Sequence, residues 1–302
     1  MNIIGHKYIF LSLSGLLVLA SVAALGVWGL HMGIDFTGGS LLQVSFTDAR
    51  PASEAIRDSM KGLGIGSVAI ELAEDRDVIM RFRSVDESEH QVILRALAEW
   101  GPMQEKKFTT IGPTIGTEFK NRALMALILA LALIVLYITW AFRHVSRPLP
   151  SWKYGSVAVV VALFHDIVIP TGLFSLLGRF GGAEADALFV TALLTILGFS
   201  VHDTIVVFDR TRENLHNLKK PEQFNETINR SVNETLARSL FTSFTVLLVL
   251  AAVFFLGGAS TRYFTLTLMA GVLFGTYSSI FVASPLLVLW NDFTNRRGMD
   301  KK

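Results

Sequence analysis

The stretch that decides the fold is ALMALILALALIVLYITWAF, residues 123–142, which holds no charged side chain. An α-helix rises about 1.5 Å per residue, so roughly twenty apolar residues cross the hydrocarbon core of a bilayer. Five further stretches have this character, and the predicted spans are 8–30, 123–142, 154–177, 187–208, 240–256 and 264–290. The whole chain agrees, because 51% of its 302 residues are hydrophobic and 17% are charged. The sequence therefore predicts a polytopic membrane protein with six transmembrane helices.

Lys and Arg residues gather in two of the loops between spans and in the C-terminal tail. Short loops that carry Lys and Arg stay on the cytoplasmic side. The cations that decide the orientation are Arg143, Arg147, Lys153, Arg210, Arg212, Lys219, Lys220, Arg230, Arg238, Arg296, Arg297, Lys301 and Lys302. Both termini are therefore predicted to be cytoplasmic, with a cytoplasmic loop at 209–239 and a tail at 291–302. The segment 31–120 becomes an extracytoplasmic domain between the first helix (1–30) and the other five (121–290).

Two properties of the whole chain limit its chemistry. The formal net charge of +2 reflects the bias of cytoplasmic loops, so it does not predict a nucleic-acid partner. The chain has no cysteine, so the extracytoplasmic domain folds without disulfides.

The extracytoplasmic segment alternates between strand-like and helix-like hydrophobic spacing. Strands are expected at 41–47, 68–72, 78–82 and 104–111, and helices at 52–63 and 87–100. This β-α-β-β-α-β order is the ferredoxin-like pattern, an α+β fold with two helices on one face of an antiparallel sheet. The segment contains no metal-ligand spacing, nucleophile elbow or phosphate loop. Binding or mechanical work therefore suits this domain better than catalysis.

A glycine-rich segment connects the first span to this domain. It reads Gly33-Ile34-Asp35-Phe36-Thr37-Gly38-Gly39-Ser40, and its glycines allow sharp backbone turns. Residues 111–116, Ile-Gly-Pro-Thr-Ile-Gly, mirror it where the chain returns to the membrane. Asp35, Phe36, Gly38 and Gly39 are therefore candidate connector residues, with a structural turn and a hinge both open as interpretations.

Two predicted spans carry an aspartate beside a histidine: His165-Asp166 in the third and His202-Asp203 in the fourth. Placing an ionised Asp in the middle of a span costs roughly 2.5 to 3.5 kcal/mol, so the carboxylate needs a partner, a water-filled path or a proton that neutralises it. Asp166 suits either a contact between helices or proton transfer. A functional role is favoured for Asp203, because it shares a helix face with Arg210 within an unusually polar run. For His202, an interhelical hydrogen bond and a functional role are equally open.

The fifth and sixth spans carry three further features. Arg238 begins the fifth span and is either a snorkelling interface residue or a counter-charge for Asp203. Apolar residues recur every four positions before it, at Phe224, Ile228, Val232 and Leu236, which predicts an amphipathic helix at the membrane surface. In the sixth span Gly271 and Gly275, followed by Ser278 and Ser279, predict close helix packing.

These motifs together resemble the SecF family of the bacterial protein-export machinery, over nearly the whole chain. The resemblance rests on residues 33–39, on His202-Asp203-Thr204-Ile205-Val206-Val207-Phe208-Asp209-Arg210, on Arg238-Ser239, and on 277–285, Tyr-Ser-Ser-Ile-Phe-Val-Ala-Ser-Pro. The single short extracytoplasmic domain resembles that of SecF, because SecD carries a larger one. One departure is His202, where many relatives have Asn.

The resemblance implies half of a transporter of the RND superfamily, completed by six helices of SecD. It implies that the proton gradient drives late steps of preprotein export across the bacterial cytoplasmic membrane. The implied partners are SecD, the SecYEG channel, YajC, an unfolded preprotein and membrane lipid. No cofactor is implied besides the proton as coupling ion, and the implied proton pathway holds Asp203, Arg238, His202 and Asp166.

Three other functions fit parts of the sequence. An RND exporter of drugs or lipids would carry both halves and larger outer domains in one chain. An intramembrane aspartyl protease needs two aspartates that share a proton, but neither aspartate here lies in the Gly-x-Gly-Asp setting of those proteases. A metal site would need His165, Asp166, His202 and Asp203 to converge. We therefore expect an accessory transport subunit without enzyme activity or a bound metal.

Overall fold

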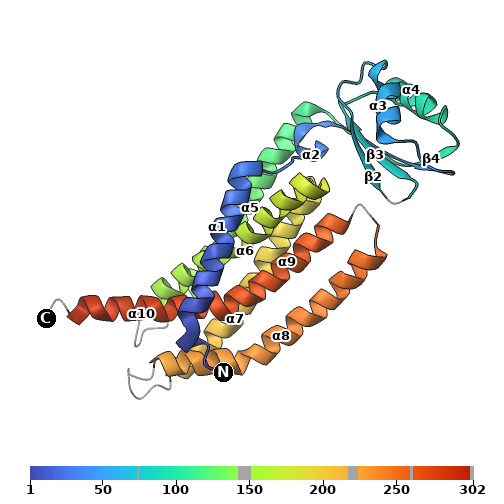
Figure 1. The fold of residues 1–302 in the computed structure, drawn as a ribbon. Coiled ribbons are helices and arrows are strands. Elements are labelled where there is room, and N and C mark those ends of the chain that lie inside the picture. Colours follow the sequence, from blue (N-terminus) through green and yellow to red (C-terminus); the bar gives the residue numbers. More distant parts are fainter. Residues whose placement is uncertain (74, 142–150, 217–223, 259–260, 300–302) are drawn as a thin grey trace. The chain divides into compact units, whose positions relative to one another are not determined.

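The computed structural model describes residues 1–302 except 74, 142–150, 217–223, 259–260 and 300–302. It contains two compact units (Figure 1): a helical unit of Met1–Leu30, Ala126–Ala183 and Leu188–Lys302, and an α+β unit of His31–Met125 with Glu184–Ala187. Several cations behind the predicted orientation lie outside the described residues or have undescribed side chains: Arg143, Arg147, Lys153, Lys219, Lys220, Arg296, Arg297, Lys301 and Lys302. The side of the membrane that each loop faces therefore stays a prediction.

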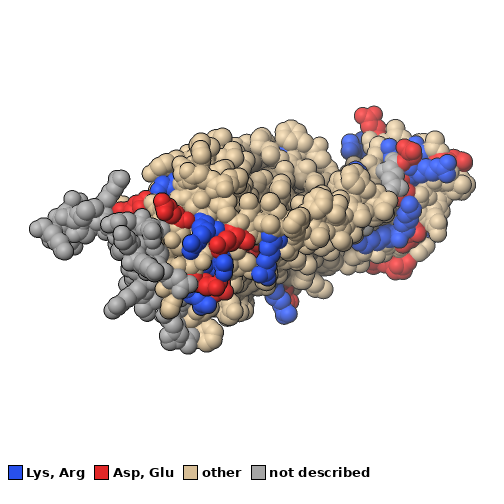
Figure 2. Space-filling view, turned by 90° about the horizontal axis from the view of Figure 1, so that it is seen from below, with Lys and Arg blue, Asp and Glu red and all other residues tan. Residues whose placement is uncertain are grey.

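Six helices in the described part of the chain are long and apolar enough to cross a membrane, which confirms the predicted fold class. They are α1 (Lys7–Trp28, after the turn η1 at Ile4–His6), α5 (Pro113–Ala141), α6 (Ser151–Gly181), α7 (Ala187–His216), α8 (Phe224–Leu256), and a last span of α9 (Arg262–Ser278), η4 (Ser279–Ala283) and α10 (Ser284–Met299). Only 6% and 11% of the most apolar segments of α5 and α8 are buried inside the protein, against 67% of that segment in the last span. Figure 2 shows long stretches of the molecule without charged side chains, as lipid-facing helices require.

The last span is one helix with a π-helical turn in its middle. The turn η4 lies between α9 and α10, and the helix changes direction there in Figure 1. Pro285 follows shortly after the turn and has no N–H to donate to the preceding turn of helix, which favours a local change of hydrogen bonding. Single π-turns are rare and occur often at functional sites.

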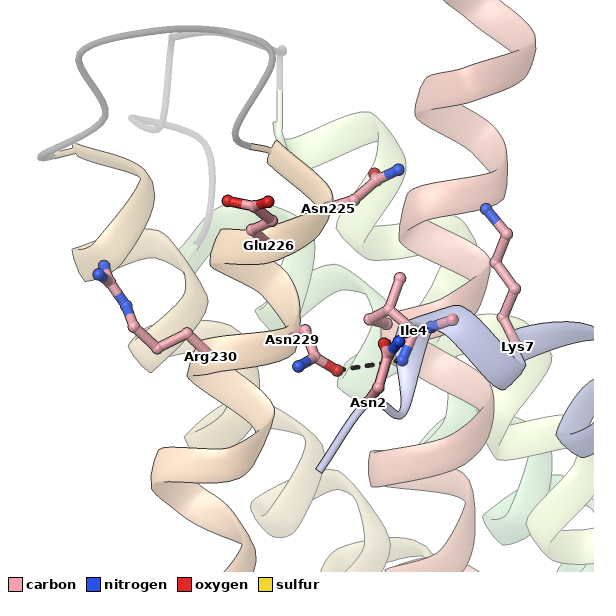
Figure 3. A pocket seen from close by; sticks show the side chains of 8 residues that line it. Asn2, Ile4, Lys7, Asn225, Glu226, Asn229 and Arg230 are labelled. Atoms are coloured by element: carbon pink, nitrogen blue, oxygen red, sulfur yellow. Dashed lines mark hydrogen bonds between the residues drawn. The ribbon is translucent and has the colours of Figure 1, made fainter.

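Asparagine side chains of α8 hold the start of the chain (Figure 3). The Oδ1 of Asn229 accepts from the N–H groups of Ile3 and Ile4 at 2.8 and 3.1 Å. The Nδ2 groups of Asn229 and Asn233 donate to the Met1 carbonyl at 2.9 and 2.8 Å. Ile3 and Ile4 are buried in one cluster with Phe224, Ile228 and Val232. The apolar stripe that we predicted at the membrane surface is therefore covered by the protein itself, and it is continuous with the fifth span.

The α+β unit contains a four-stranded antiparallel sheet in the order β2-β3-β1-β4. Its elements are α2 (Ile34–Thr37), β1 (Gly39–Phe46), α3 (Ser53–Lys61), β2 (Ala69–Ala73), β3 (Asp77–Phe82), α4 (Glu87–Ala98) and β4 (Met103–Ile111). The predicted strands and helices are confirmed within a few residues, and α2 adds one helical turn inside the connector. Alternate residues of β1, among them Leu42 and Val44, pack with Ile56 of α3 and Ile93 of α4 in one buried core.

The start of α4 is encoded locally. Asp86 caps the helix, because its Oδ1 accepts from the N–H of Glu89 at 2.9 Å while the Glu89 side chain accepts from the N–H of Asp86 at 3.1 Å. This reciprocal capping box satisfies two N–H groups that a helix start leaves free.

Asp77 is a buried acidic residue at the start of β3, with 3% of its surface exposed. Lys106 of β4 lies 2.8 Å from its Oδ2, and Gln43 of β1 donates to the same atom at 3.0 Å. Burial alone would raise the pKa of Asp77, but the hydrogen bonds from Lys106, Ser45 and Gln43 outweigh it and lower the pKa below its ordinary value of 3.8. The carboxylate therefore joins three strands in its ionised form.

Asp77→Asn is expected to destabilise the sheet by about 1 to 2 kcal/mol at neutral pH, the cost of losing a hydrogen bond to a charged group. Because the folded pKa of Asp77 is lowered, its stabilisation is fully present above pH 3.8 and is lost as the pH falls below that value. Amide hydrogen exchange of β3 in the full-length protein measures both effects. An unchanged acid dependence of exchange in the variant would show that another group is responsible.

Candidate functional site

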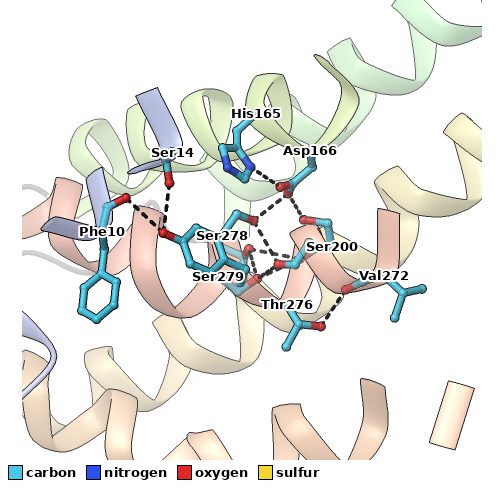
Figure 4. A network of polar contacts seen from close by, with 12 residues as sticks. Phe10, Ser14, His165, Asp166, Ser200, Val272, Thr276, Ser278 and Ser279 are labelled. Atoms are coloured by element: carbon cyan, nitrogen blue, oxygen red, sulfur yellow. Dashed lines mark hydrogen bonds and ion pairs between the residues drawn. The ribbon is translucent and has the colours of Figure 1, made fainter. Parts of the chain in front are cut away.

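Asp166 of α6 lies at the centre of a buried polar network (Figure 4). Its side chain is fully buried, and His165 Nδ1 lies 2.9 Å from its Oδ1. Its Oδ2 accepts hydrogen bonds from the hydroxyl groups of Ser278, at 2.8 Å, and Ser200. Asp166 therefore joins α6, α7 and α9 through polar contacts, which is one of the two roles that the sequence left open.

His165 extends this network toward α1. Its ring stacks on Tyr277 with centroids 6.1 Å apart, and the Tyr277 hydroxyl donates to the Phe10 carbonyl at 3.0 Å. The Nε2 of His165 is buried and has no hydrogen-bond partner among the described residues.

Asp203 of α7 lies in a different environment, with 8% of its surface exposed. Its Oδ1 accepts from the hydroxyl of Ser239 in α8 at 2.5 Å. Its Oδ2 is buried without a hydrogen bond of good geometry in the described part of the chain, although the hydroxyl of Ser279 lies close to the carboxyl group. An unpaired carboxylate oxygen is costly away from water. This atom is the best candidate in the network for taking up a proton.

Hydroxyl groups connect the surroundings of the two aspartates. Thr204, the neighbour of Asp203, donates to the Ser200 carbonyl at 3.0 Å and shares a hydrogen bond of 2.9 Å with Ser279. Ser200 in turn contacts Asp166. A continuous set of polar contacts therefore runs from Asp166 to the residue beside Asp203, and it includes the first residue of the π-turn.

Sequence reasoning missed the serines of this network. We attributed Ser278 and Ser279 to helix packing, whereas they bind Asp166 and Thr204. The packing prediction itself is confirmed, because a Cβ added at Gly271 would lie 2.1 Å from Ile196 of α7. Close contact of α7 and α9 is what brings these hydroxyls within reach, and only their position beside a predicted packing face could have signalled it.

The remaining predicted residues lie around Asp203. Arg238 is exposed and within electrostatic range of Asp203, but no ion pair between them is formed in the described structure. His202 is also exposed and within electrostatic range of Asp203. Arg210 binds Glu234 of α8 and Glu213, each at 2.6 Å, rather than Asp203.

The connector residues are arranged within the α+β unit. The Oδ2 of Asp35 accepts from the N–H of Ala187 at 2.9 Å, and Phe36 is buried and stacks on Phe119. Gly38 and Gly39 have positive φ angles of 74° and 134°, which residues with a side chain rarely adopt. The segment is therefore a tightly packed turn.

The two aspartates do not form a catalytic pair among the described residues, since each binds its own serines. Among the same residues, no group of three or more His, Asp or Glu side chains is arranged to hold a metal ion. Six spans with a buried polar network, joined to a ferredoxin-like unit, are typical of a polytopic membrane transport subunit.

Comparison with known proteins identifies the family. Residues 92–292 match the model of the protein export membrane protein SecD/SecF C-terminal domain, and residues 23–49 match the SecD/SecF GG motif. The chain is 40% identical to the protein translocase subunit SecF of Thermobaculum terrenum, over 96% of this chain and 94% of the relative. It is 36% identical to that of Synechocystis sp., over 92% and 90%. The chain belongs to the SecD/SecF family, as a SecF-type subunit.

Solved structures agree with this assignment. SecDF from Thermus thermophilus matches with a TM-score of 0.84 and 34% identity over 97% of this chain, which spans 39% of that longer chain. SecDF in a super-membrane-facing form matches with a TM-score of 0.70 and 32% identity, over all of this chain and 40% of the other. The protein is therefore a multi-pass protein of the bacterial inner membrane and an accessory subunit of the Sec translocase.

Proposed function

We propose that this subunit pairs with SecD and uses the proton gradient to promote late steps of preprotein export. Protons are the coupling ion in this proposal, and no other cofactor takes part. The proposal places both termini in the cytoplasm and the α+β unit outside, where it acts on unfolded preprotein leaving the SecYEG channel, with YajC as a further partner. Support comes from the solved SecDF structures and from their similarity to this chain.

The observation that carries the proposal is the unpaired Oδ2 of Asp203. This oxygen lies in a buried setting where a proton removes the cost of an isolated charge. When Arg238 comes close, its charge favours the ionised form, and when the helices shift the carboxylate takes up a proton. Asp166 has partners on both oxygens, so we infer that it positions Ser200 and Ser278 rather than exchanging protons in each cycle.

The test is proton entry in vesicles that contain this chain with SecD. An acidic exterior is expected to acidify the interior faster than in vesicles with SecD alone, and a protonophore is expected to stop preprotein export. Export that is insensitive to the protonophore would overturn the proton-driven mechanism.

Arg238→Gln is expected to reduce proton entry by about tenfold, the factor that corresponds to losing about 1.4 kcal/mol of electrostatic bias. Arg238→Lys keeps the charge but loses the planar guanidinium. Because no bidentate contact joins Arg238 to Asp203 in the described structure, the Lys variant is expected to keep most of the proton entry. Equal losses in both variants would mean that the guanidinium itself contacts a partner during the cycle.

A further inference from the structure

The loop between α6 and α7 is part of the α+β unit. Its residues Glu184–Asp186 and the first residue of α7, Ala187, cluster with His31–Met125 and not with the rest of α6 and α7. We call these four residues the strap. The predicted spans left Glu184–Asp186 in a short loop and put Ala187 at the start of the fourth span, and their contacts show a further role.

The strap pairs with the connector through its backbone. Ala185 donates its N–H to the His31 carbonyl at 2.7 Å, and Gly33 donates to the Ala185 carbonyl at 2.8 Å. Met32 and Ala185 form a parallel β-bridge. Two backbone hydrogen bonds therefore attach the strap to the residues that follow the first span.

Two side-chain contacts, one at each end of the strap, add to this attachment. The Oε2 of Glu184 lies 2.8 Å from the Nε of Arg81, and Arg81 also binds Glu71 of β2 at 3.0 Å. Burial raises the pKa of Glu184, the Arg81 guanidinium partly offsets this, and the carboxylates of Glu71 and Asp186 raise the pKa further. The Arg81–Glu184 ion pair is therefore one attachment of the strap, and the carboxylate of Asp35 supplies a second.

Asp35 acts on the first residue of α7. The N–H groups at a helix start have no partner inside the helix and carry partial positive charge. The carboxylate of Asp35 accepts one of them, that of Ala187. The same helix carries Asp203 roughly 24 Å further along, at about 1.5 Å per residue.

We propose that Asp35 and Glu184 are positioning residues that fasten the start of α7 to the α+β unit, so that α7 and this unit move together. The proposal rests on the proposed function, in which a shift of the helices accompanies protonation of Asp203. A rigid helix transmits such a shift along its axis, and the strap passes it to β3 through Arg81 and to the connector through Asp35. The coupling runs through the strap in addition to the chain connections at residues 30–31 and 125–126.

The first experiment weakens the strap. Asp35→Ala with Glu184→Ala is expected to lower export on the order of tenfold, the factor for losing a charge-assisted hydrogen bond. Proton entry in the same vesicles is expected to persist, because Asp203 and its surroundings are unchanged. Asp48→Ala with Glu54→Ala, two exposed acids of the same unit, serves as the control and is expected to leave both quantities unchanged.

The second experiment restores the strap covalently. The chain has no native cysteine, and a Cβ at Gly33 would lie 3.4 Å from that of Asp186, near the separation of about 3.5 to 4.5 Å in disulfides. Gly33→Cys with Asp186→Cys, added to the weakened variant, is expected to recover export on oxidation and to lose it again with reductant. A merely structural role of Asp35 would not give this redox-dependent rescue.

Two results would overturn the proposal. One is a failure of the disulfide to restore export although it forms. The other is a block of export by the disulfide in the otherwise native chain, which would mean that the strap must detach. Neither result touches the proposed function, which fails separately if proton entry does not depend on Asp203.

Discussion

Proton entry is expected to fall to the background of vesicles with SecD alone when Asp203 is replaced by Asn, and export driven by the proton gradient falls with it. Asn has nearly the shape of Asp, and its side-chain oxygen can still accept the hydrogen bond from Ser239. The substitution therefore keeps the contact between α7 and α8 and removes only the ability to carry a proton. Internal pH and the export of a slow preprotein measure the two effects in parallel.

Two variants serve as controls for this experiment. Asp209→Asn removes an exposed acid from the same helix and is expected to leave proton entry unchanged. Asp166→Asn changes the carboxylate that has partners on both oxygens, so we expect reduced stability but measurable proton entry. Normal proton entry in Asp203→Asn, together with a loss in Asp166→Asn, would exchange the roles that we assign to the two aspartates.

Gly38→Ala is expected to remove most of the folded protein from the membrane fraction. The φ angle of Gly38 is 74°, and a Cβ there would lie 2.6 Å from the Cα of Pro113, a backbone atom that cannot rotate away. With a ψ angle of 164° as well, Gly38 has a backbone conformation that essentially only glycine adopts, and it costs an L-residue about 1 to 3 kcal/mol. The clash adds to this cost, and a total above about 3 kcal/mol is a large part of a typical stability of 5 to 15 kcal/mol. Membrane-fraction immunoblots and thermal unfolding in detergent measure the loss.

Alanine variants at two other glycines of the same unit distinguish the cost of backbone strain from the cost of the steric clash. Gly64 also has a positive φ, 68°, but nothing lies within 4 Å of an added Cβ, so Gly64→Ala carries the strain alone. Gly62 has a φ of −81° and equally open space, so Gly62→Ala is expected to be neutral or slightly stabilising. Equal stability of all three variants would show that the connector turn relaxes without cost.

The fold was predictable because its determinants are local. Each span is a long, mostly apolar run, and β1 shows its own alternation, as at Leu42 and Val44. Asp86 and Glu89 likewise mark the start of α4 within four residues. Such signals need no knowledge of what packs against them.

The contacts of the candidate site could not be predicted in the same way, because they join residues far apart in the chain. Ser278 reaches Asp166 across 112 positions, and Ser239 reaches Asp203 across 36. A serine in an apolar helix gives no indication of its partner, which depends on how the helices rotate against each other. The contacts of the strap could not be predicted for the same reason, because four residues are too few to show a periodic pattern.

The strap makes the α+β unit discontinuous in sequence. A fragment that contains only residues 31–125 lacks Glu184–Ala187, so Met32 loses its bridge partner, Arg81 keeps only Glu71, and Asp35 loses the helix start that it caps. Solubility or proteolysis studies of that fragment would therefore measure an incomplete fold. A fragment that carries the strap sequence after a flexible linker supplies the missing partners and is the appropriate form for binding work on this unit.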